Sequence, residues 1–170
     1  VEAVDKLRDT ATSHNRVFFV EVMGRDAGFI ALNSGIASGA QDILIPEQRD
    51  SVEELCESIE RSEKSGKKSS IVIVAEGEQL GGIYEIAKNV QNKYPDYDIR
   101  VTVLGHIQRG GSPTCHDRVL ASRLGIAAVE GLLDGKTNLM AGIRSSKIVF
   151  TPIDEAIKKH NEIDEELIKV

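Results

Sequence analysis

Apolar residues in this chain alternate between short continuous runs and segments with helical spacing. Runs rich in β-branched residues predict strands at 16–22, 42–45, 69–75 and 100–104. Apolar residues three and four positions apart predict helices at 1–10, 27–37, 51–66, 83–94 and 117–133. Because strand and helix alternate with short connections, the sequence predicts an α/β fold, a doubly wound, mostly parallel sheet in three layers.

Local signals mark where several of these elements begin and end. Ser51 and Glu54 have the spacing of a capping box, in which two side chains satisfy free N–H groups at a helix start. Gly39 is suited to end the second helix in a left-handed conformation. We expect Cys56 in the core, a last strand over 143–150 and a last helix over 152–159.

Composition narrows the class of protein. The 170 residues carry a net charge of -6, which argues against a nucleic-acid or anionic membrane surface, because such surfaces need a basic face. No long apolar run suggests a membrane span, and two cysteines without CxxC spacing fit a reducing cytoplasm. The chain begins without methionine, inside a helical pattern, so we expect a fragment.

The candidate chemistry follows the predicted strands. Arg25 follows the first strand, Glu76 the third, and His106 and Arg109 the fourth. In a parallel sheet these loops share the carboxyl edge, where ligands bind. Arginines beside glycine-rich backbone in an acidic protein suit a sugar phosphate, whose hydroxyls Glu76 could bind.

A second basic set lies at the opposite edge. Arg16 and Arg100 open their strands, and a six-residue strand holds them roughly 20 Å from the carboxyl edge. If they bind the same ligand, they must serve a neighbouring subunit, which implies an oligomer. Arg8, Lys67 and Lys68 form a candidate second anion site at the amino edge.

Simpler interpretations remain open for these residues. Single arginines and lysines are mostly solvated surface charges, and His106 could be a hydrogen-bonded structural residue. Asp26, Glu78 and Asp117 could form a metal or acid–base pair, although helix-capping and surface roles are commoner. The sequence has no Walker loop and no metal-ligand spacing.

Two long motifs carry a resemblance to a known family. They are Val20-Glu-Val-Met-Gly-Arg25 with the following Asp-Ala-Gly28, and Thr102-Val-Leu-Gly-His-Ile-Gln-Arg-Gly-Gly-Ser-Pro113. The chain resembles the carboxyl-terminal half of the ATP-dependent bacterial-type 6-phosphofructokinases over almost its whole length. These enzymes transfer a phosphoryl group from ATP to the 1-hydroxyl of fructose 6-phosphate in glycolysis.

The resemblance implies roles for the residues at the carboxyl edge. Met23, Gly24 and Arg25 would contact fructose 6-phosphate, and Arg25 would also act catalytically by steadying the transferring phosphoryl group. Glu76 would bind sugar hydroxyls. The sugar and its 6-phosphate would be held by His106 and Arg109.

The family's two neighbour-supplied arginines fall on Arg16 and Arg100, within a homotetramer. Its effector site, for a nucleotide diphosphate or phosphoenolpyruvate, would take Arg8, Lys67 and Lys68. Gln41 stands where the family commonly has a glutamate near the metal of the bound nucleotide, so the effector stays open.

The family's glycine-rich ATP loop and its catalytic aspartate segment have no counterpart in this sequence, so ATP and Mg²⁺ would bind mostly in the missing half. We therefore expect the fragment to be inactive by itself. By resemblance, 1–107 with 145–170 would form the substrate and effector domain, and 108–144 would pack on the ATP-binding domain. A non-catalytic sugar-phosphate sensor and a pyrophosphate-dependent phosphofructokinase are the alternative functions.

Overall fold

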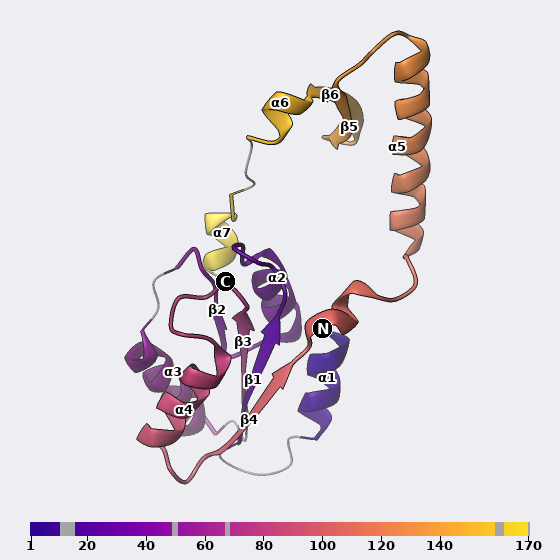
Figure 1. The fold of residues 1–170 in the computed structure, drawn as a ribbon. Coiled ribbons are helices and arrows are strands. Elements are labelled where there is room, and N and C mark those ends of the chain that lie inside the picture. Colours follow the sequence, from indigo (N-terminus) through magenta and orange to yellow (C-terminus); the bar gives the residue numbers. More distant parts are fainter. Residues whose placement is uncertain (11–15, 49–50, 67–68, 159–161, 170) are drawn as a thin grey trace. The chain divides into compact units, whose positions relative to one another are not determined.

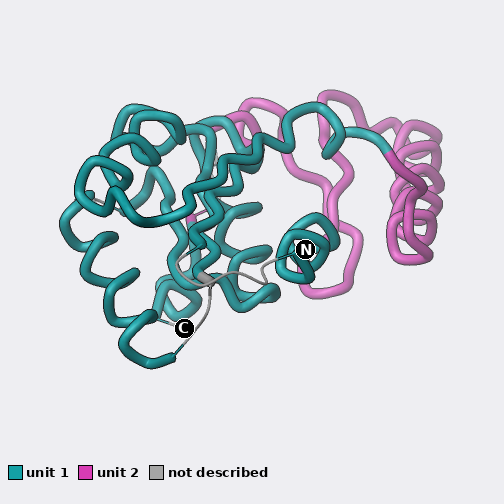
Figure 2. Tube along the Cα trace, turned by 90° about the horizontal axis from the view of Figure 1, so that it is seen from below, with its two compact units in different colours: residues 1–110, 163–170 teal, residues 111–162 magenta. Residues whose placement is uncertain are grey.

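The computed structural model describes residues 1–10, 16–48, 51–66, 69–158 and 162–169. The chain divides into two compact units, shown in different colours in Figure 2. The first unit comprises Val1–Gly110 and Ile163–Val170, and the second comprises Gly111–Glu162.

The first unit is built on a four-stranded sheet in the order β2-β3-β1-β4 (Figure 1). Its strands are β1 (Arg16–Val22), β2 (Asp42–Leu44), β3 (Ser69–Ala75) and β4 (Asp98–Val103). All three neighbouring pairs are parallel. The predicted α/β fold with a parallel sheet is therefore confirmed.

Helices cover both faces of this sheet, which completes the predicted three layers. One face packs against α1 (Glu2–Asp9) and α2 (Phe29–Ser38), and the other against α3 (Val52–Lys64) and α4 (Ile83–Lys93). Alternate residues of β1 serve the two cores: Phe19 faces α3 and α4, whereas Val20 faces α1 and α2. The short helix α7 (Glu165–Ile168) also belongs to this unit.

The capping signals act as the sequence predicts. The Ser51 hydroxyl accepts from the Glu54 amide at 3.1 Å, and the Glu54 carboxylate accepts from the Ser51 amide at 3.0 Å. Gly39 ends α2 with a φ of 59°. Cys56, on the inner face of α3, is fully buried in the core.

Strand register brings three connections to one level. Val22 lies opposite Ala75, and Glu21 lies opposite Val103. The ladder continues one step beyond each strand, because the Glu76 amide donates to Val22 and the Leu104 amide donates to Glu21. The segments that follow β1, β3 and β4 therefore start side by side.

The second unit contains the long helix α5 (Cys115–Leu133), β5 (Leu139–Arg144), β6 (Lys147–Pro152) and the short helix α6 (Ile153–Ala156). The prediction of one strand over 143–150 is wrong, because β5 and β6 form an antiparallel hairpin. Ser145 and Ser146, with φ of 48° and 64°, make its tight turn. The sequence hid this turn because serine rarely adopts that conformation.

The predicted helix over 152–159 is also too long, since α6 ends at Ala156. The compact units group 145–162 with α5, whereas the resemblance assigned 145–170 to the first domain. None of the helices in the described ranges is both long and apolar enough to cross a membrane.

Candidate functional site

A pocket of about 300 Å³ opens where the segments after β1, β3 and β4 meet. It is lined by Met23, Gly24, Arg25, Ile30, Glu76, Gln108 and Arg109. Five of the six residues predicted for substrate binding at this edge are therefore brought together. The sixth, His106, lies exposed on the adjoining 3-10 helix η1 (Gly105–Arg109) without lining the pocket.

The turn after β1 is held by the carboxylate of Glu76. One oxygen, Oε1, accepts from the backbone amide of Arg25 at 2.6 Å and from that of Gly24 at 3.3 Å. These bonds fix Arg25 in a left-handed conformation with a φ of 56°, which costs free energy for any residue other than glycine. Among the described residues, none donates to the second oxygen of Glu76.

Close backbone packing joins the same two turns. A β-carbon at Gly77 would lie 1.9 Å from the carbonyl oxygen of Arg25. A β-carbon at Gly24 would lie 2.3 Å from the carbonyl oxygen of Ala27. Only glycine fits at either position, so the segments after β1 and β3 form one rigid wall of the pocket.

Gln108 connects η1 to this wall. Its Oε1 accepts from the Met23 amide at 3.3 Å, and its Nε2 donates to the Gly105 carbonyl at 3.1 Å. Gln108 lines the pocket, yet the sequence reasoning gave it no role. Because the side chain is uncharged, nothing in the sequence singles it out. Its role becomes visible only in the structure, where its amide oxygen accepts from the segment after β1 and its amide nitrogen donates to the start of η1.

Three carboxylates lie near this edge, and they differ in environment. Burial raises the pKa of Glu21 above its ordinary value of 4.5, and the negative charges of Glu76 and Glu78 raise it further. Glu78 accepts from the amides of Leu80 and Gly82 at the start of α4. Glu78 thus holds the loop that leads into α4, although α4 has no side-chain cap at Gly82.

Asp117 has the same kind of role in the second unit. It forms a capping box with Thr114 at the start of α5, and the hydrogen bond from the Thr114 side chain lowers its pKa below 3.8. Within the described ranges, no three histidine, cysteine or acidic side chains are grouped to hold a metal ion.

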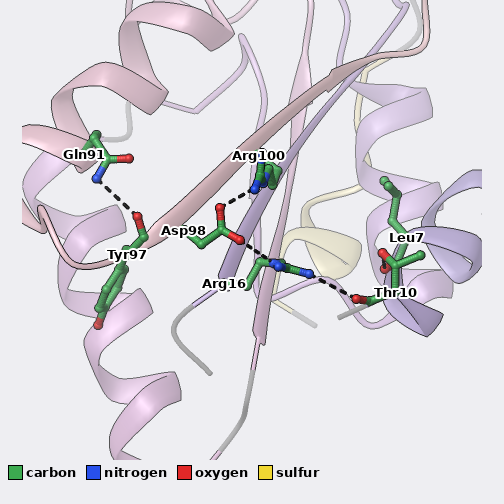
Figure 3. Close-up of polar contacts among 7 residues, drawn as sticks. All are labelled: Leu7, Thr10, Arg16, Gln91, Tyr97, Asp98 and Arg100. Atoms are coloured by element: carbon green, nitrogen blue, oxygen red, sulfur yellow. Dashed lines mark hydrogen bonds and ion pairs between the residues drawn. The ribbon is translucent and has the colours of Figure 1, made fainter. Parts of the chain in front are cut away.

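At the amino edge, Arg16 and Arg100 meet on one carboxylate that the sequence analysis overlooked. Asp98 accepts from Nε of Arg16 at 2.7 Å and pairs with Nε of Arg100 at 2.8 Å (Figure 3). The Arg16 hydrogen bond is the main reason that the pKa of Asp98 lies below 3.8. The predicted strand started at Arg100, whereas β4 begins at Asp98, directly opposite Arg16.

The third basic set is only partly described. Arg8 donates to the carbonyl groups of Ser38 and Gly39, at the carboxyl end of α2, where a cation is favoured. Lys67 and Lys68 lie outside the described residues. Gln41 donates through Nε2 to the Ser58 hydroxyl at 3.2 Å.

A family model and similar curated proteins all point to the phosphofructokinases. The family model described as Phosphofructokinase matches residues 1–132. The chain is 55% identical over 170 residues to ATP-dependent 6-phosphofructokinase 2 of Bacteroides thetaiotaomicron, covering 100% of this chain and 52% of that protein. It is 49% identical to ATP-dependent 6-phosphofructokinase 1 of Thermus thermophilus, with the same coverage. The chain thus spans about half the length of the curated relatives it matches.

Solved structures agree. Phosphofructokinase from Saccharomyces cerevisiae superposes with a TM-score of 0.83 at 37% identity, over 92% of this chain and 22% of that chain. A pyrophosphate-dependent phosphofructokinase from Marinobacter aquaeolei gives a TM-score of 0.72 at 26% identity, over 88% of this chain and 41% of that chain.

The contact between Gly77 and Arg25 predicts a specific sensitivity. Gly77→Ala should lower the free energy of unfolding by roughly 1–3 kcal/mol, as overpacking does, and shift the amide NMR signals of Gly24 and Arg25. Gly110→Ala is the matched control, because a β-carbon there meets nothing within 4 Å. Equal urea-unfolding curves for the two variants would contradict the packing argument.

Because the pKa of Glu21 is raised, removing its charge should stabilise the folded protein at neutral pH but not in acid. The folded protein disfavours the ionised carboxyl, so its cost is full at neutral pH and vanishes below a pH of about 4. Glu21→Gln should therefore be more stable than the wild type at neutral pH and equal to it in acid. Urea unfolding at several pH values measures this, with exposed Glu130→Gln as the control. A constant difference at every pH would refute the assignment.

Proposed function

Because the chain belongs to the phosphofructokinase family, we propose that it is the substrate-binding half of an ATP-dependent 6-phosphofructokinase. The complete enzyme would transfer a phosphoryl group from ATP to the 1-hydroxyl of fructose 6-phosphate. The observation that carries this proposal is the pocket in which Arg25, Glu76 and Arg109 converge from three different segments.

In this proposal, different pocket residues bind different parts of the sugar phosphate. Arg109 provides the charge for the 6-phosphate, and His106 on the same short helix would complete that grip. The second carboxylate oxygen of Glu76 accepts from sugar hydroxyls, while its first oxygen holds the turn that carries Arg25. Met23 and Gly24, which also line the pocket, would contact the sugar.

Arg25 is the catalytic residue in this proposal. Its side chain is exposed at the pocket, and its backbone is fixed by Glu76, so its guanidinium is presented without a further change of the turn. A fixed cation near the transferring phosphoryl group stabilises the negative charge that group carries during transfer.

ATP and Mg²⁺ would bind mostly outside this chain, in the half that carries the family's catalytic aspartate. Without it, residues 1–170 bind sugar phosphate but do not turn it over. ATP is preferred over pyrophosphate as the donor because the ATP-dependent relatives are 49–55% identical, whereas the pyrophosphate-dependent structure is 26% identical. Nothing in these relatives' names favours a non-catalytic sensor.

The assembly is a homotetramer in the cytoplasm, in which Arg16 and Arg100 serve a neighbouring subunit's sugar site. Their place at the amino edge supports this, because neither lines the pocket of its own chain. Arg8, Lys67 and Lys68 would bind a nucleotide diphosphate or phosphoenolpyruvate as effector. Arg8 would then exchange the carbonyls at the end of α2 for the effector's anion.

The segment 108–144 would pack against the ATP-binding domain. Its helix α5 exposes apolar side chains, with Leu132 at 66% and Leu133 at 82% of their full area. Such a face needs a protein partner to remove it from water.

A coupled spectrophotometric assay of the full-length enzyme tests the reaction. We expect fructose 6-phosphate to be phosphorylated with ATP and not with pyrophosphate. Turnover with pyrophosphate alone would overturn the donor assignment. Binding of fructose 6-phosphate without turnover on either donor would favour the sensor.

Mixing two inactive variants tests the shared site. Arg100→Ala damages the site of a neighbour, whereas Arg109→Ala damages the site of its own chain. Hybrid tetramers should therefore regain part of the wild-type activity, because some sites then combine an intact Arg100 with an intact Arg109. Arg109→Ala mixed with His106→Ala is the control and should regain nothing, because both residues belong to the same chain's site.

A further inference from the structure

One carboxylate, that of Asp98, lies between two arginine side chains at the amino edge of the sheet and contacts both. The two oxygens of Asp98 are divided between the arginines, with Oδ2 on Arg16 and Oδ1 on Arg100, both through Nε (Figure 3). Arg100 lies opposite Phe18 in the register, two positions beyond Arg16 along β1. Both arginines therefore approach the same acid from neighbouring strands.

The turn that presents Asp98 is itself fixed. Nε2 of Gln91, on α4, donates to the carbonyl groups of Tyr94, Pro95 and Tyr97 at 3.1–3.2 Å. The rings of Tyr94 and Tyr97 stack with their centroids 4.9 Å apart. Asp98 follows directly, so its carboxylate has a rigid base.

Arg16 is held on a second side. Its Nη1 donates to the Thr10 carbonyl at 3.1 Å, and the Thr10 hydroxyl donates to the Leu7 carbonyl at 2.7 Å (Figure 3). Its side chain is only 20% exposed. Arg16 thus has a fixed position, and within the described ranges its Nη2 makes no hydrogen bond.

Arg100 is held only by Asp98 among the described residues, and its side chain is 62% exposed. The contact uses Nε, and neither terminal nitrogen, Nη1 or Nη2, makes a hydrogen bond to a described residue. That end of a guanidinium can still make two parallel hydrogen bonds to a phosphate. Asp98 therefore does not compete for the atoms that a phosphate needs.

We infer that Asp98 is a positioning residue, which holds Arg16 and Arg100 together as a preformed grip for a phosphate monoester. This rests on the proposed function, in which both arginines reach the sugar phosphate of a neighbouring subunit. Asp98 offsets the repulsion between the two cations and restricts a flexible arginine before the ligand arrives, which reduces the entropy lost on binding. The three charges sum to +1, so the cluster still attracts an anion.

Asp98→Asn in the full-length enzyme tests this inference. The amide keeps the shape but loses the charge and one acceptor, so the affinity for fructose 6-phosphate, measured by calorimetry, should fall about tenfold. KM for fructose 6-phosphate should rise similarly, while kcat and KM for ATP stay within about twofold. Asp98→Glu, which retains a carboxylate, should recover part of the loss. The matched control is Asp96→Asn, a neutralised exposed carboxylate on the same turn, which should behave as the wild type.

The same Asp98→Asn change in an enzyme that lacks both arginines distinguishes a positioning role of Asp98 from a general loss of stability. In an Arg16→Ala/Arg100→Ala enzyme, Asp98→Asn should cause no further loss, because the groups through which Asp98 acts are gone. Unchanged or tighter binding in Asp98→Asn, or an equal loss in both backgrounds, would overturn the inference and leave the proposed function intact. A wild-type enzyme that does not bind fructose 6-phosphate would overturn both.

Discussion

The parallel register of β1, β3 and β4 is the constraint on which the rest of this molecule depends. Since Val22, Ala75 and Val103 end their strands at nearly one level, three segments far apart in sequence leave the sheet together. A change of register by one residue would turn every side chain of a strand to the opposite face and shift the end of that strand relative to its neighbours.

The same sheet separates two kinds of polar cluster. At the carboxyl edge, Glu76 uses backbone amides to shape a turn, and the arginines there remain available to a ligand. At the amino edge, Asp98 bonds arginine side chains directly and fixes their spacing. In both places an acidic residue organises the basic ones, so local basic clusters persist in a chain with a net charge of -6.

The sequence predicted the first unit well because its signals are local and consistent. Apolar runs, the capping box at Ser51 and the left-handed Gly39 each determine a few neighbouring residues. The charged residues that line the pocket, Arg25, Glu76 and Arg109, could be predicted because a charge directly after an apolar strand stands out in the sequence. Gln108 and Asp98 were missed because their roles depend on partners more than 80 residues away, which no local pattern shows. The hairpin of β5 and β6 was missed because serines occupy turn positions that usually reveal themselves through glycine or asparagine.

The fit of Gly77 against the Arg25 carbonyl also bears on how this pocket can vary among related proteins. Positions 24, 25, 76 and 77 are joined by two hydrogen bonds from backbone amides to Glu76 and by one contact, between Gly77 and the Arg25 carbonyl, that excludes a β-carbon. A substitution at one of these positions would break a hydrogen bond or create a clash unless the residue that it contacts also changed. Substitutions at these positions should therefore be inherited as a set, and a relative that alters one should alter its partner on the other turn.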